Sequence, residues 1–394
     1  MIKKSLPLIF ILFYFHGFSQ KTIQEEIASN ILEDSRNIKI YLPKGYEKDS
    51  LKNYPLTIVL DAEYLFDTYV GNSVLFALKD KSPKQIIVGI PMKNTKKKDT
   101  YFNSDNGMLY ESNIAFYEFI RDEVLFFMES NYRTSFFISL VGEGTSANLI
   151  SHFLKERKPF INSYICINPT FSKFVRQEFQ SYNLNKFLKE DNTFYLYTNN
   201  STSFSIKKQA TIGTLQRDLA ALKLKNFHIV NDTIKTASSI SAMSEAIPRA
   251  INKIFEIYAP ISKEEFKKNI ENKSPKDAIL YLENKYIEIE FLFGSNIGIR
   301  ERDIYAIENI IIDKENGDYL RDFGKMILKL FPTSPLGEYY IGRYYESGKN
   351  IRKALKYYKI GYGKMDPGDP NSEAFYENIL RLGGRIKLLS TPTK

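Results

Sequence analysis

Two patterns of hydrophobic and polar positions alternate along the first part of this 394-residue chain. Short apolar runs rich in Val and Ile are typical of strands buried on both faces, and apolar residues three or four positions apart predict helices between them. The predicted strands are residues 36–42, 56–60, 85–90, 136–141, 163–167, 193–197 and 226–230. The predicted helices are residues 71–78, 113–132, 146–156, 206–223 and 241–258. Strands that alternate with helices indicate an α/β fold with a mostly parallel sheet covered on both faces.

The pattern changes to helix alone from residue 261 onward. Residues 261–271 and 275–289 each have the spacing of a helix, and the short polar stretch between them predicts an antiparallel pair. A stronger helical unit spans residues 338–367, and a weaker one spans residues 304–332. We therefore predict a small all-α domain over residues 261–394, behind the α/β domain.

The stronger helical unit follows the spacing of a tetratricopeptide repeat (TPR). The small residues Gly342 and Ala354 stand where two paired helices approach each other, and Tyr345 and Tyr358 stand where the space between them is filled. Arrays of such helix pairs often bind peptides or proteins, but a short array can also serve only as a cap on the neighbouring domain. Both interpretations of this TPR-like domain stay open.

Residues 1–20 have the composition of a secretory signal peptide. Lys3 and Lys4 precede an apolar run at residues 6–15, and small and polar residues follow it. The run is too short to span a bilayer comfortably, and no later segment is long and uncharged enough to do so. We predict that the chain is exported and localises to the periplasm, with secretion or surface association as alternatives. The richness in Lys, Asn and Ile resembles proteins of Bacteroidota.

Charge and cysteine content argue against several classes of function. The net charge of +9 falls to +7 without Lys3 and Lys4, and the basic residues are scattered rather than gathered in a dense tract, so nucleic-acid binding is not predicted. A weak attraction to an anionic envelope surface remains open. The single cysteine, Cys166, lies in an apolar run and leaves no internal disulfide. The chain has no HExxH, no paired CxxC and no P-loop, so we predict neither a metal site nor a cofactor.

A glycine-rich turn is the most informative stretch of the chain. An apolar strand at residues 136–141 enters Gly142, Glu143 and Gly144 and continues into the apolar pattern of a helix. This order of strand, tight turn and helix resembles the nucleophile elbow of α/β-hydrolases, which reads GxSxG and carries the catalytic serine. In this chain Gly144 takes the place of that serine. Glycine tolerates the turn but supplies no nucleophile.

A series of short motifs extends the resemblance over the α/β domain, residues 21–260. The motifs are Ser29–Leu32, Arg36, Tyr41–Tyr46, Tyr54 with Pro55, Leu60 with Asp61, Val88–Ile90, Asp99, Phe119–Val124, Tyr132–Thr134 and Gly142. Their order and spacing are similar to those of the esterase family that includes esterase D, enterochelin esterase and feruloyl esterases. The resemblance implies an α/β-hydrolase fold for this domain and, in active members, a triad of Ser, Asp or Glu, and His.

The resemblance also implies where the triad would stand, and all three places lack the catalytic residue. Gly144 stands at the nucleophile. The family's acid follows the strand that ends at Tyr197, so its place falls at Asn199 or the adjacent Asn200, and neither is a carboxylate. The catalytic histidine precedes the last helix, at Ala237. The loss of all three residues together predicts a protein without esterase activity.

Chemical reasoning without the family leads to the same expectation. A hydroxyl nucleophile needs a base within hydrogen-bond reach. His152 stands about two helical turns beyond Gly144, roughly 12 Å by helical rise, and His228 lies in a predicted strand, so both are expected to be packed or surface histidines. Ser146 is the nearest hydroxyl and a weak candidate for a relocated nucleophile. The simpler interpretation of this serine is a residue in the first turn of the helix that caps it or faces backbone amides.

Polar side chains near the elbow are candidates for binding a ligand or a partner. They are Asp61, Glu63, Tyr64, Glu143 and Asn200. Asp61 and Glu63 follow a buried strand, on the loop that supplies an oxyanion amide in hydrolases. A carboxylate pair there suggests acid–base chemistry, although ordinary carboxylates at a pocket rim are the simpler interpretation.

Three functions remain open, and the first is favoured. The first is a pseudoenzyme of the bacterial cell envelope that binds another envelope protein, as a scaffold component of an envelope or outer-membrane assembly, through its hydrolase face or residues 300–390. The second is a serine-type ester hydrolase with a relocated nucleophile, which acts on a siderophore, sugar or feruloyl ester. The third is a protein that binds a small ligand in the former active site.

Overall fold

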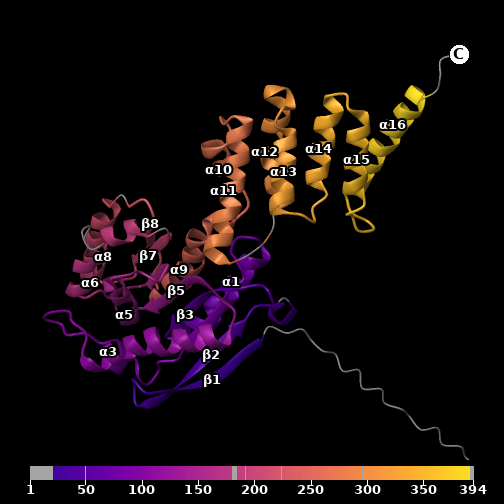
Figure 1. Ribbon diagram of the computed structural model, residues 1–394. Helices are drawn as coiled ribbons and strands as arrows, with labels where there is room; N and C mark the ends of the chain where they lie inside the picture. Colours follow the sequence, from indigo (N-terminus) through magenta and orange to yellow (C-terminus); the bar gives the residue numbers. More distant parts are fainter. Residues whose placement is uncertain are drawn as a thin grey trace, which may run out of the picture.

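The computed structural model describes residues 21–390, apart from residues 49, 180–183, 191, 223, 295–296 and 298. The signal peptide expected at residues 1–20 lies outside the described residues. Figure 1 shows two parts, an α/β domain and an array of helices that leads away from it. The last turn before the array is the 3-10 helix Glu256–Tyr258.

Among the described residues, eight strands form one mixed sheet with the order β1-β2-β4-β3-β5-β6-β7-β8. The strands are β1 (Lys21–Ser29), β2 (Asp34–Leu42), β3 (Tyr54–Leu60), β4 (Ile86–Ile90), β5 (Thr134–Glu143), β6 (Ser163–Ile167), β7 (Phe194–Ser201) and β8 (Phe227–Ile234). β1 pairs antiparallel with β2, and β2 with β4, whereas all other neighbouring strands are parallel. The prediction of a mostly parallel sheet is confirmed.

The edge strand β1 is the strand that the sequence pattern does not predict. It forms a hairpin with β2, in register from Lys21 opposite Leu42 to Ser29 opposite Asp34. Only one of its faces meets the core, where Ile27 is buried. An antiparallel edge strand can present its other face to water, so it does not need the continuous apolar run that marks the inner strands.

Helices cover both faces of the sheet, each over its own hydrophobic core. One face packs against α1 (Leu65–Leu78), α9 (Ser239–Ile254) and the end of α11 (Pro275–Phe293). The other face packs against α3 (Glu111–Glu118), α4 (Leu125–Asn131), α5 (Thr145–Ser151), α6 (Lys173–Glu178) and α8 (Ile206–Ala220). The predicted helix 113–132 contains a π-helical turn, Phe119–Val124, between α3 and α4. The predicted helix 146–156 ends early, as α5 followed by the 3-10 turn His152–Lys155.

The second part of the described chain consists of helices alone, which confirms the prediction of a helical C-terminal region. Its helices are α10 (Lys263–Asn269), α11, α12 (Glu301–Asp313), α13 (Leu320–Leu330), α14 (Leu336–Ser347), α15 (Ile351–Tyr362) and α16 (Ser372–Ser390). From α13 onward each helix packs against the next one in the chain. The assignment of these helices to TPR units stays a prediction.

Helix α11 connects the two parts. Its start is fixed by the Ser274 hydroxyl, which accepts a hydrogen bond from the Asp277 amide, and by Pro275 in the first turn. Its end is fixed by Gly294, whose φ of 61° is in the left-handed region that ends many helices. At that end Phe293 packs edge-on against Phe137 of β5, with ring centroids 5.0 Å apart. The array therefore begins on the core of the α/β domain.

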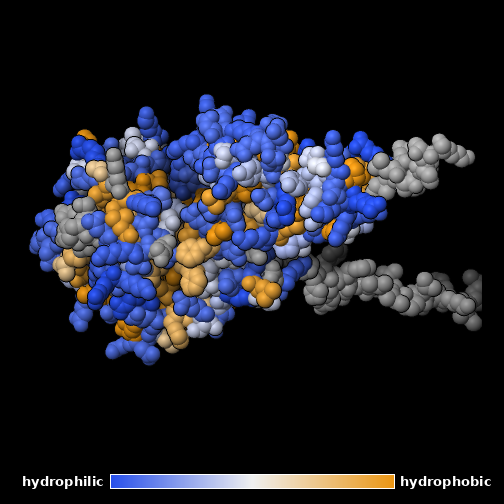
Figure 2. Space-filling model, turned by 45° about the horizontal axis from the view of Figure 1, so that its top comes forward, coloured by the Kyte–Doolittle hydropathy of each residue, from blue (hydrophilic) through white to orange (hydrophobic). Residues whose placement is uncertain are grey.

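Hydrophobic side chains are exposed among the polar ones on the surface. The face shown in Figure 2 is mostly hydrophilic, with small groups of hydrophobic residues between. Exposed large hydrophobic side chains include Phe126, Phe136, Ile206 and Ile240. Among the described helices, none is long and apolar enough to cross a membrane.

Candidate functional site

The turn at Gly144 has the strained backbone shape expected of a nucleophile elbow. Its φ of 62° and ψ of −115° join β5 to α5, in a region that residues with a side chain rarely adopt. The Gly144 amide donates to the Ile167 carbonyl at 3.1 Å, and its carbonyl accepts from the Thr170 amide at 3.0 Å. A Cβ atom built on Gly144 meets nothing within 4 Å. The space in which a nucleophile would stand is therefore open.

Gly142 has a different role, which is to let the chain pack on itself. A Cβ atom on Gly142 would lie 2.7 Å from the carbonyl carbon of Ser146 and 2.9 Å from the amide nitrogen of Ala147. The first turn of α5 thus lies directly on the backbone of β5, where only glycine fits. This close approach makes the turn sharp.

A cluster of charged groups that the sequence pattern does not reveal lies beside the turn. Its centre is Lys96, in the short helix α2 (Lys96–Thr100). The ammonium group of Lys96 lies 2.9 Å from Asp61 Oδ1 and 3.3 Å from Glu143 Oε2. It also donates to the Tyr64 hydroxyl at 3.1 Å. Three of the predicted binding candidates, Asp61, Tyr64 and Glu143, are therefore brought together by one lysine.

Burial and charge oppose each other in this cluster. Burial raises the pKa of Asp61, whereas the charge and hydrogen bond of Lys96, the Ser146 hydroxyl and the Glu143 amide lower it, and the balance is a pKa above the usual range. Burial lowers the pKa of Lys96, but Asp61 and the other partners raise it more, so this lysine stays protonated. Both carboxylates, Asp61 and Glu143, are held by the same lysine ammonium group. The cluster is therefore suited to holding the loops in place.

A buried ion pair holds α2, and with it Lys96, at the site. The Arg36 guanidinium donates from Nη1 to Asp99 Oδ2 at 3.0 Å and from Nη2 to Asp99 Oδ1 at 2.9 Å. Nη1 also donates to the hydroxyl of Thr95, the residue before α2, at 2.8 Å. Arg36 is on β2 and lies over the ring of Phe116. Arg36 and Asp99 both belong to the motifs that carry the family resemblance. They are the residues from which the position of α2 at the site could have been predicted.

Ser146 lies in the first turn of α5, as expected, but it does not cap the helix. The cap position of α5 is Gly144, and no side chain makes a cap hydrogen bond there. Ser146 lies in the first turn but on its buried side, with none of its surface exposed. Its hydroxyl is close enough to Asp61 to lower the pKa of that carboxyl, yet among the described residues it has no hydrogen-bond partner of standard geometry.

Amide side chains tie together the segments in which the sequence places the acid and the histidine. Asn199 is fully buried and exchanges two hydrogen bonds with Asn168, since its Oδ1 accepts from the Asn168 amide at 2.7 Å and its Nδ2 donates to Asn168 Oδ1 at 2.8 Å. Asn168 Nδ2 donates in turn to the Ser239 carbonyl at 3.0 Å. Ala237, two residues before Ser239, is exposed. Asn199 is therefore part of the packing of the domain.

Two other predicted candidates bind backbone groups. Glu63 Oε2 accepts from the Met92 amide at 2.9 Å, at the end of β4. Asn200 Nδ2 donates to the carbonyl of Gln209 in α8 at 3.0 Å. Asp61 and Glu63 thus have separate partners and do not form an acid–base pair. A binding role for Glu63 and Asn200 stays a prediction.

Both histidines of the described chain have packing contacts. His152 is buried and stacks on Phe174, with ring centroids 5.1 Å apart, and its Nε2 lies 3.4 Å from Asn148 Nδ2. Burial lowers the pKa of His152 to about 3, so the ring is neutral at pH 7. His228 is on β8 and stacks on Tyr195 at 5.2 Å. Both are packed or surface histidines, as the sequence predicts.

The described residues include candidate metal ligands and one cysteine, Cys166, and their arrangement favours neither a metal site nor a reactive thiol. No group of three or more His, Cys, Asp or Glu side chains there is arranged to hold a metal ion. Cys166 is a free, buried thiol on β6. Burial raises its pKa to about 12, which keeps the thiol protonated and unreactive.

Comparison with known proteins supports an esterase-like fold for this chain. The family described as "Putative esterase" matches residues 29–147, which run from the end of β1 into α5 and include the Gly144 turn. The chain has an esterase-like fold. The match covers less than half of the chain, so the family resemblance is carried by the first strands and the elbow.

Solved structures support the same fold. An uncharacterised protein from Capnocytophaga ochracea superposes with a TM-score of 0.80 at 23% identity, over 92% of this chain and all 100% of its own. An IroE-like serine hydrolase from Shewanella oneidensis has a TM-score of 0.55 at 19% identity, over 79% of this chain and 98% of its own. The siderophore hydrolase EstA from Aspergillus nidulans has a TM-score of 0.50 at 13% identity, over 66% of this chain and 100% of its own. Among curated proteins, none matches this sequence.

These likenesses concern the fold. The first of them is long enough to include the helical array as well as the α/β domain. The two hydrolases have the esterase-like architecture in common with this chain. At these identities the comparison says nothing of shared catalytic residues, so the chemistry of this chain has to be argued from its own site.

Proposed function

We propose that this protein is an esterase-like pseudoenzyme of the bacterial cell envelope that acts by binding another protein. The observation that carries the proposal is Gly144, which has the backbone conformation of a catalytic elbow, with open space in front of it, and no hydroxyl. A strained turn at this position is costly for any residue with a side chain. Its presence without a nucleophile fits a scaffold that no longer hydrolyses esters.

The groups around the turn support the same proposal. Hydroxyl nucleophiles need a general base, and the carboxylates nearest the turn, Asp61 and Glu143, are paired with Lys96. The residue at the acid position, Asn199, uses both ends of its amide in hydrogen bonds to Asn168. The position of the histidine is taken by the exposed Ala237.

The alternative of a relocated nucleophile rests on Ser146. Its hydroxyl is next to Asp61, which gives the serine an acceptor within reach. Against this, the hydroxyl is buried, so an ester carbonyl reaches it only if α5 moves. A serine-type hydrolase that acts on a siderophore, sugar or feruloyl ester therefore needs a second conformation of the site.

The activity is tested with the purified chain from residue 21 to the end. We expect no turnover of p-nitrophenyl acetate or butyrate above the buffer rate, and no labelling by a fluorophosphonate probe, with an active serine esterase as the positive control. Turnover that is lost on Ser146→Ala would establish the relocated nucleophile and overturn the pseudoenzyme proposal. Turnover that survives this change points to another nucleophile and overturns it equally.

The surface proposed to bind the partner is the helical array at residues 300–390. Its outer helices carry exposed aromatic side chains, and Tyr362 of α15 and Tyr376 of α16 lie side by side with ring centroids 6.1 Å apart. Their exposed fractions are 42% and 50%. Exposed tyrosine pairs are typical contact residues of protein interfaces. The hydrolase face around Gly144 is the second surface that can serve this role.

The binding proposal is tested by affinity purification of the tagged full-length protein from gently solubilised envelopes. We expect one envelope protein in near-stoichiometric amount with the wild type, and its loss with Tyr362→Ala combined with Tyr376→Ala. A matched control is Tyr101→Ala combined with Tyr110→Ala, which removes two exposed tyrosines from the hydrolase face. If the partner is lost only with the control pair, the binding surface is the hydrolase face and not the helical array. Recovery of the protein alone contradicts the binding role. The same fractions show whether the protein is exported, as residues 1–20 predict.

A further inference from the structure

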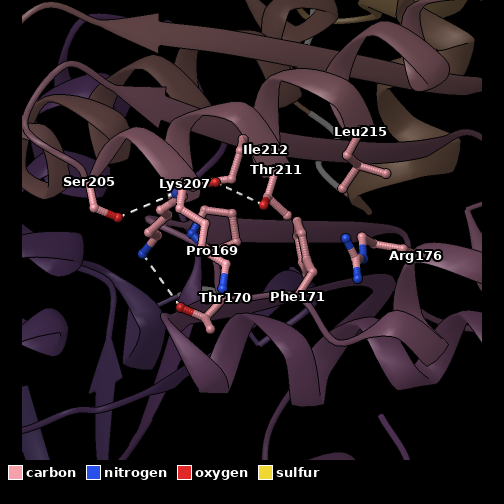
Figure 3. A pocket seen from close by; sticks show the side chains of 10 residues that line it. Pro169, Thr170, Phe171, Arg176, Ser205, Lys207, Thr211, Ile212 and Leu215 are labelled. Atoms are coloured by element: carbon pink, nitrogen blue, oxygen red, sulfur yellow. Dashed lines mark hydrogen bonds between the residues drawn. The ribbon is translucent and has the colours of Figure 1, made fainter. Parts of the chain in front are cut away.

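A cavity of about 240 Å³ lies beside the Gly144 turn, between the loop after β6 and the first turns of α8. Figure 3 shows Pro169, Thr170 and Phe171 of the loop on one side and the residues of α8 on the other. The loop is fastened to the turn, because the Thr170 amide donates to the Gly144 carbonyl at 3.0 Å. The cavity is therefore a neighbour of the former nucleophile position.

One wall of the cavity is apolar. Phe171 comes from the loop, and Ile212 and Leu215 come from successive turns of α8. Ile212 and Leu215 are almost completely buried, so their positions are fixed by the core behind them. A rigid apolar wall gains free energy by covering the hydrocarbon part of a ligand.

The other part of the lining is cationic. Arg176 of α6 and Lys207 and Lys208 of α8 border the cavity, and none of its described lining residues is acidic. The first turn of α8 faces the same space, and the partial positive charge of a helix start adds to theirs. Within the described residues, no carboxylate forms an ion pair with any of these three side chains. Their charge is therefore available to an anion.

The hydrogen bonds of these cations leave donors for a ligand. Arg176 uses its Nε to donate to the Ser172 carbonyl at 3.3 Å, and among the described residues its two terminal nitrogens have no partner. Lys208 donates to the Asn168 carbonyl at 2.7 Å and to the Thr170 hydroxyl at 3.5 Å, which uses two of its three N–H groups. A planar guanidinium fork and one ammonium N–H match the two oxygens of a carboxylate.

We infer that this cavity binds a small organic carboxylate, with its apolar body against Phe171, Ile212 and Leu215 and its carboxylate between Arg176 and Lys208. A neutral or cationic ligand of the same shape would leave these positive groups partly desolvated and unpaired, which costs free energy. The inference goes beyond the proposed function, because the cavity lies in the α/β domain, apart from the helical array at residues 300–390, and it binds a small molecule with or without a protein partner.

The binding is tested by isothermal titration calorimetry and thermal shift on the full chain. Octanoate and 3-phenylpropionate are the probes, and 1-octanol and octylamine are neutral and cationic ligands of similar shape. We expect both carboxylates to bind and to raise the melting temperature, with octanol at least tenfold weaker and octylamine without effect. None of these probes is an ester, so the result does not depend on whether the protein hydrolyses esters.

Two matched variants locate the site. Arg176→Gln removes the cation from the cavity, and Lys173→Gln removes an exposed cation from the same helix α6 that does not line it. We expect Arg176→Gln to weaken octanoate at least tenfold and Lys173→Gln to change it less than twofold. Thr211→Trp, which fills the cavity from α8, should abolish binding.

Several outcomes overturn the inference. Equal binding of octanol and octanoate would show an apolar cavity without anion recognition. Equal effects of Arg176→Gln and Lys173→Gln would show a general attraction to a basic surface. Octyl phosphate bound in place of both carboxylates would assign the cavity to phosphate monoesters. No binding of either carboxylate to the folded wild type would leave the cavity without this role.

Discussion

Arg36 Nη2 lies 2.9 Å from Asp99 Oδ1 in the interior of the α/β domain. This ion pair positions a second ion pair, between Lys96 and Asp61. Asp99 is on the short helix α2, three residues after Lys96, whose ammonium group lies 2.9 Å from Asp61 at the former active site. The exposed fractions of the Arg36 and Asp99 side chains are 7% and 1%. A helix of one turn has little stability of its own, so the buried pair decides where Lys96 stands.

Removal of one charge of the buried pair should destabilise the domain strongly. Asp99→Asn leaves the Arg36 guanidinium buried without its carboxylate, and we expect a loss of about 3–5 kcal/mol in the free energy of unfolding. The measurement is a urea unfolding curve. The matched control is Glu256→Gln, whose partner Lys253 is exposed at the end of α9, and it should cost less than about 1 kcal/mol. Equal losses in both variants would contradict a special role for the Arg36 pair.

The two glycines of the elbow should respond differently to the same substitution. Gly144→Ser places a side chain in open space, so it should fold at a cost of about 1–3 kcal/mol for the left-handed backbone. Gly142→Ser drives Cβ to 2.7 Å from the backbone of α5 and should cost more, or prevent folding. Unfolding curves compare the two variants.

The same Gly144→Ser variant also tests the missing base. We expect it to remain without turnover of p-nitrophenyl butyrate, because the new hydroxyl has no histidine to accept its proton. Turnover by this single variant would show that Lys96, Asp61 or another nearby group acts as a base. The wild type, assayed in parallel, gives the background rate.

The architecture of the α/β domain is largely predictable from the sequence, because each inner strand is a continuous apolar run that has to be buried on both faces. The turn at Gly144 is predictable for a different reason, since glycine permits the positive φ that a sharp turn from strand to helix requires. The edge strand β1 is missed because it buries only one face, where Ile27 meets the core.

The candidate site is less predictable, because its groups meet only through tertiary contacts. Asp61, Tyr64 and Glu143 are found from their positions after strands, but Lys96 stands in a lysine-rich stretch that is typical of an exposed surface. Its place depends on the Arg36–Asp99 pair, which joins residues 63 positions apart. The sequence places Ser146 correctly in the first turn of α5, but it does not show that the serine faces the core and leaves the cap position to Gly144.

The acid position tests whether the amide network has replaced a catalytic function. In Asn199→Asp, a carboxylate oxygen replaces the Nδ2 group that donates to Asn168 Oδ1, so two oxygens face each other. The substitution also buries a carboxylate. We expect a loss of about 1–3 kcal/mol at pH 7, measured by urea unfolding. Asn200→Asp, on the adjacent and partly exposed residue, is the control and should cost less. An Asn199→Asp variant as stable as the wild type would show that the site still accepts an acid.

His152 should make the stability depend on pH in mildly acidic solution. Its pKa is about 3 in the folded chain because of burial, and its ordinary value is 6.5. Below 6.5 the unfolded chain takes up a proton that the folded chain does not, so stability is present above 6.5 and falls as pH falls toward 3. Between pH 7.5 and pH 5 this group alone should cost about 2 kcal/mol. Urea unfolding at the two pH values gives the loss in the free energy of unfolding on acidification. This loss should be smaller in His152→Phe than in the wild type by the same amount. An unchanged difference would mean that the ring is accessible to protons.

The helical array should be most sensitive where α14 meets α15. A Cβ atom at Gly342 would lie 2.7 Å from the ring of Tyr358, and the ring has no room to retreat because Tyr358 is itself buried. We expect Gly342→Ala to destabilise the array by about 1–3 kcal/mol. Gly383→Ala on α16 is the matched control, because its Cβ meets nothing within 4 Å, and it should stabilise the helix by roughly 0.5–1 kcal/mol.

The measurement for this pair is hydrogen exchange resolved by peptide, because the two parts of the chain can unfold separately. Gly342→Ala should speed exchange in α14 and α15 and leave the strands of the α/β domain unchanged. Faster exchange in the sheet as well would show that the array and the α/β domain unfold as one unit. In that case α11, which packs through Phe293 on Phe137 of β5, is the element that couples them.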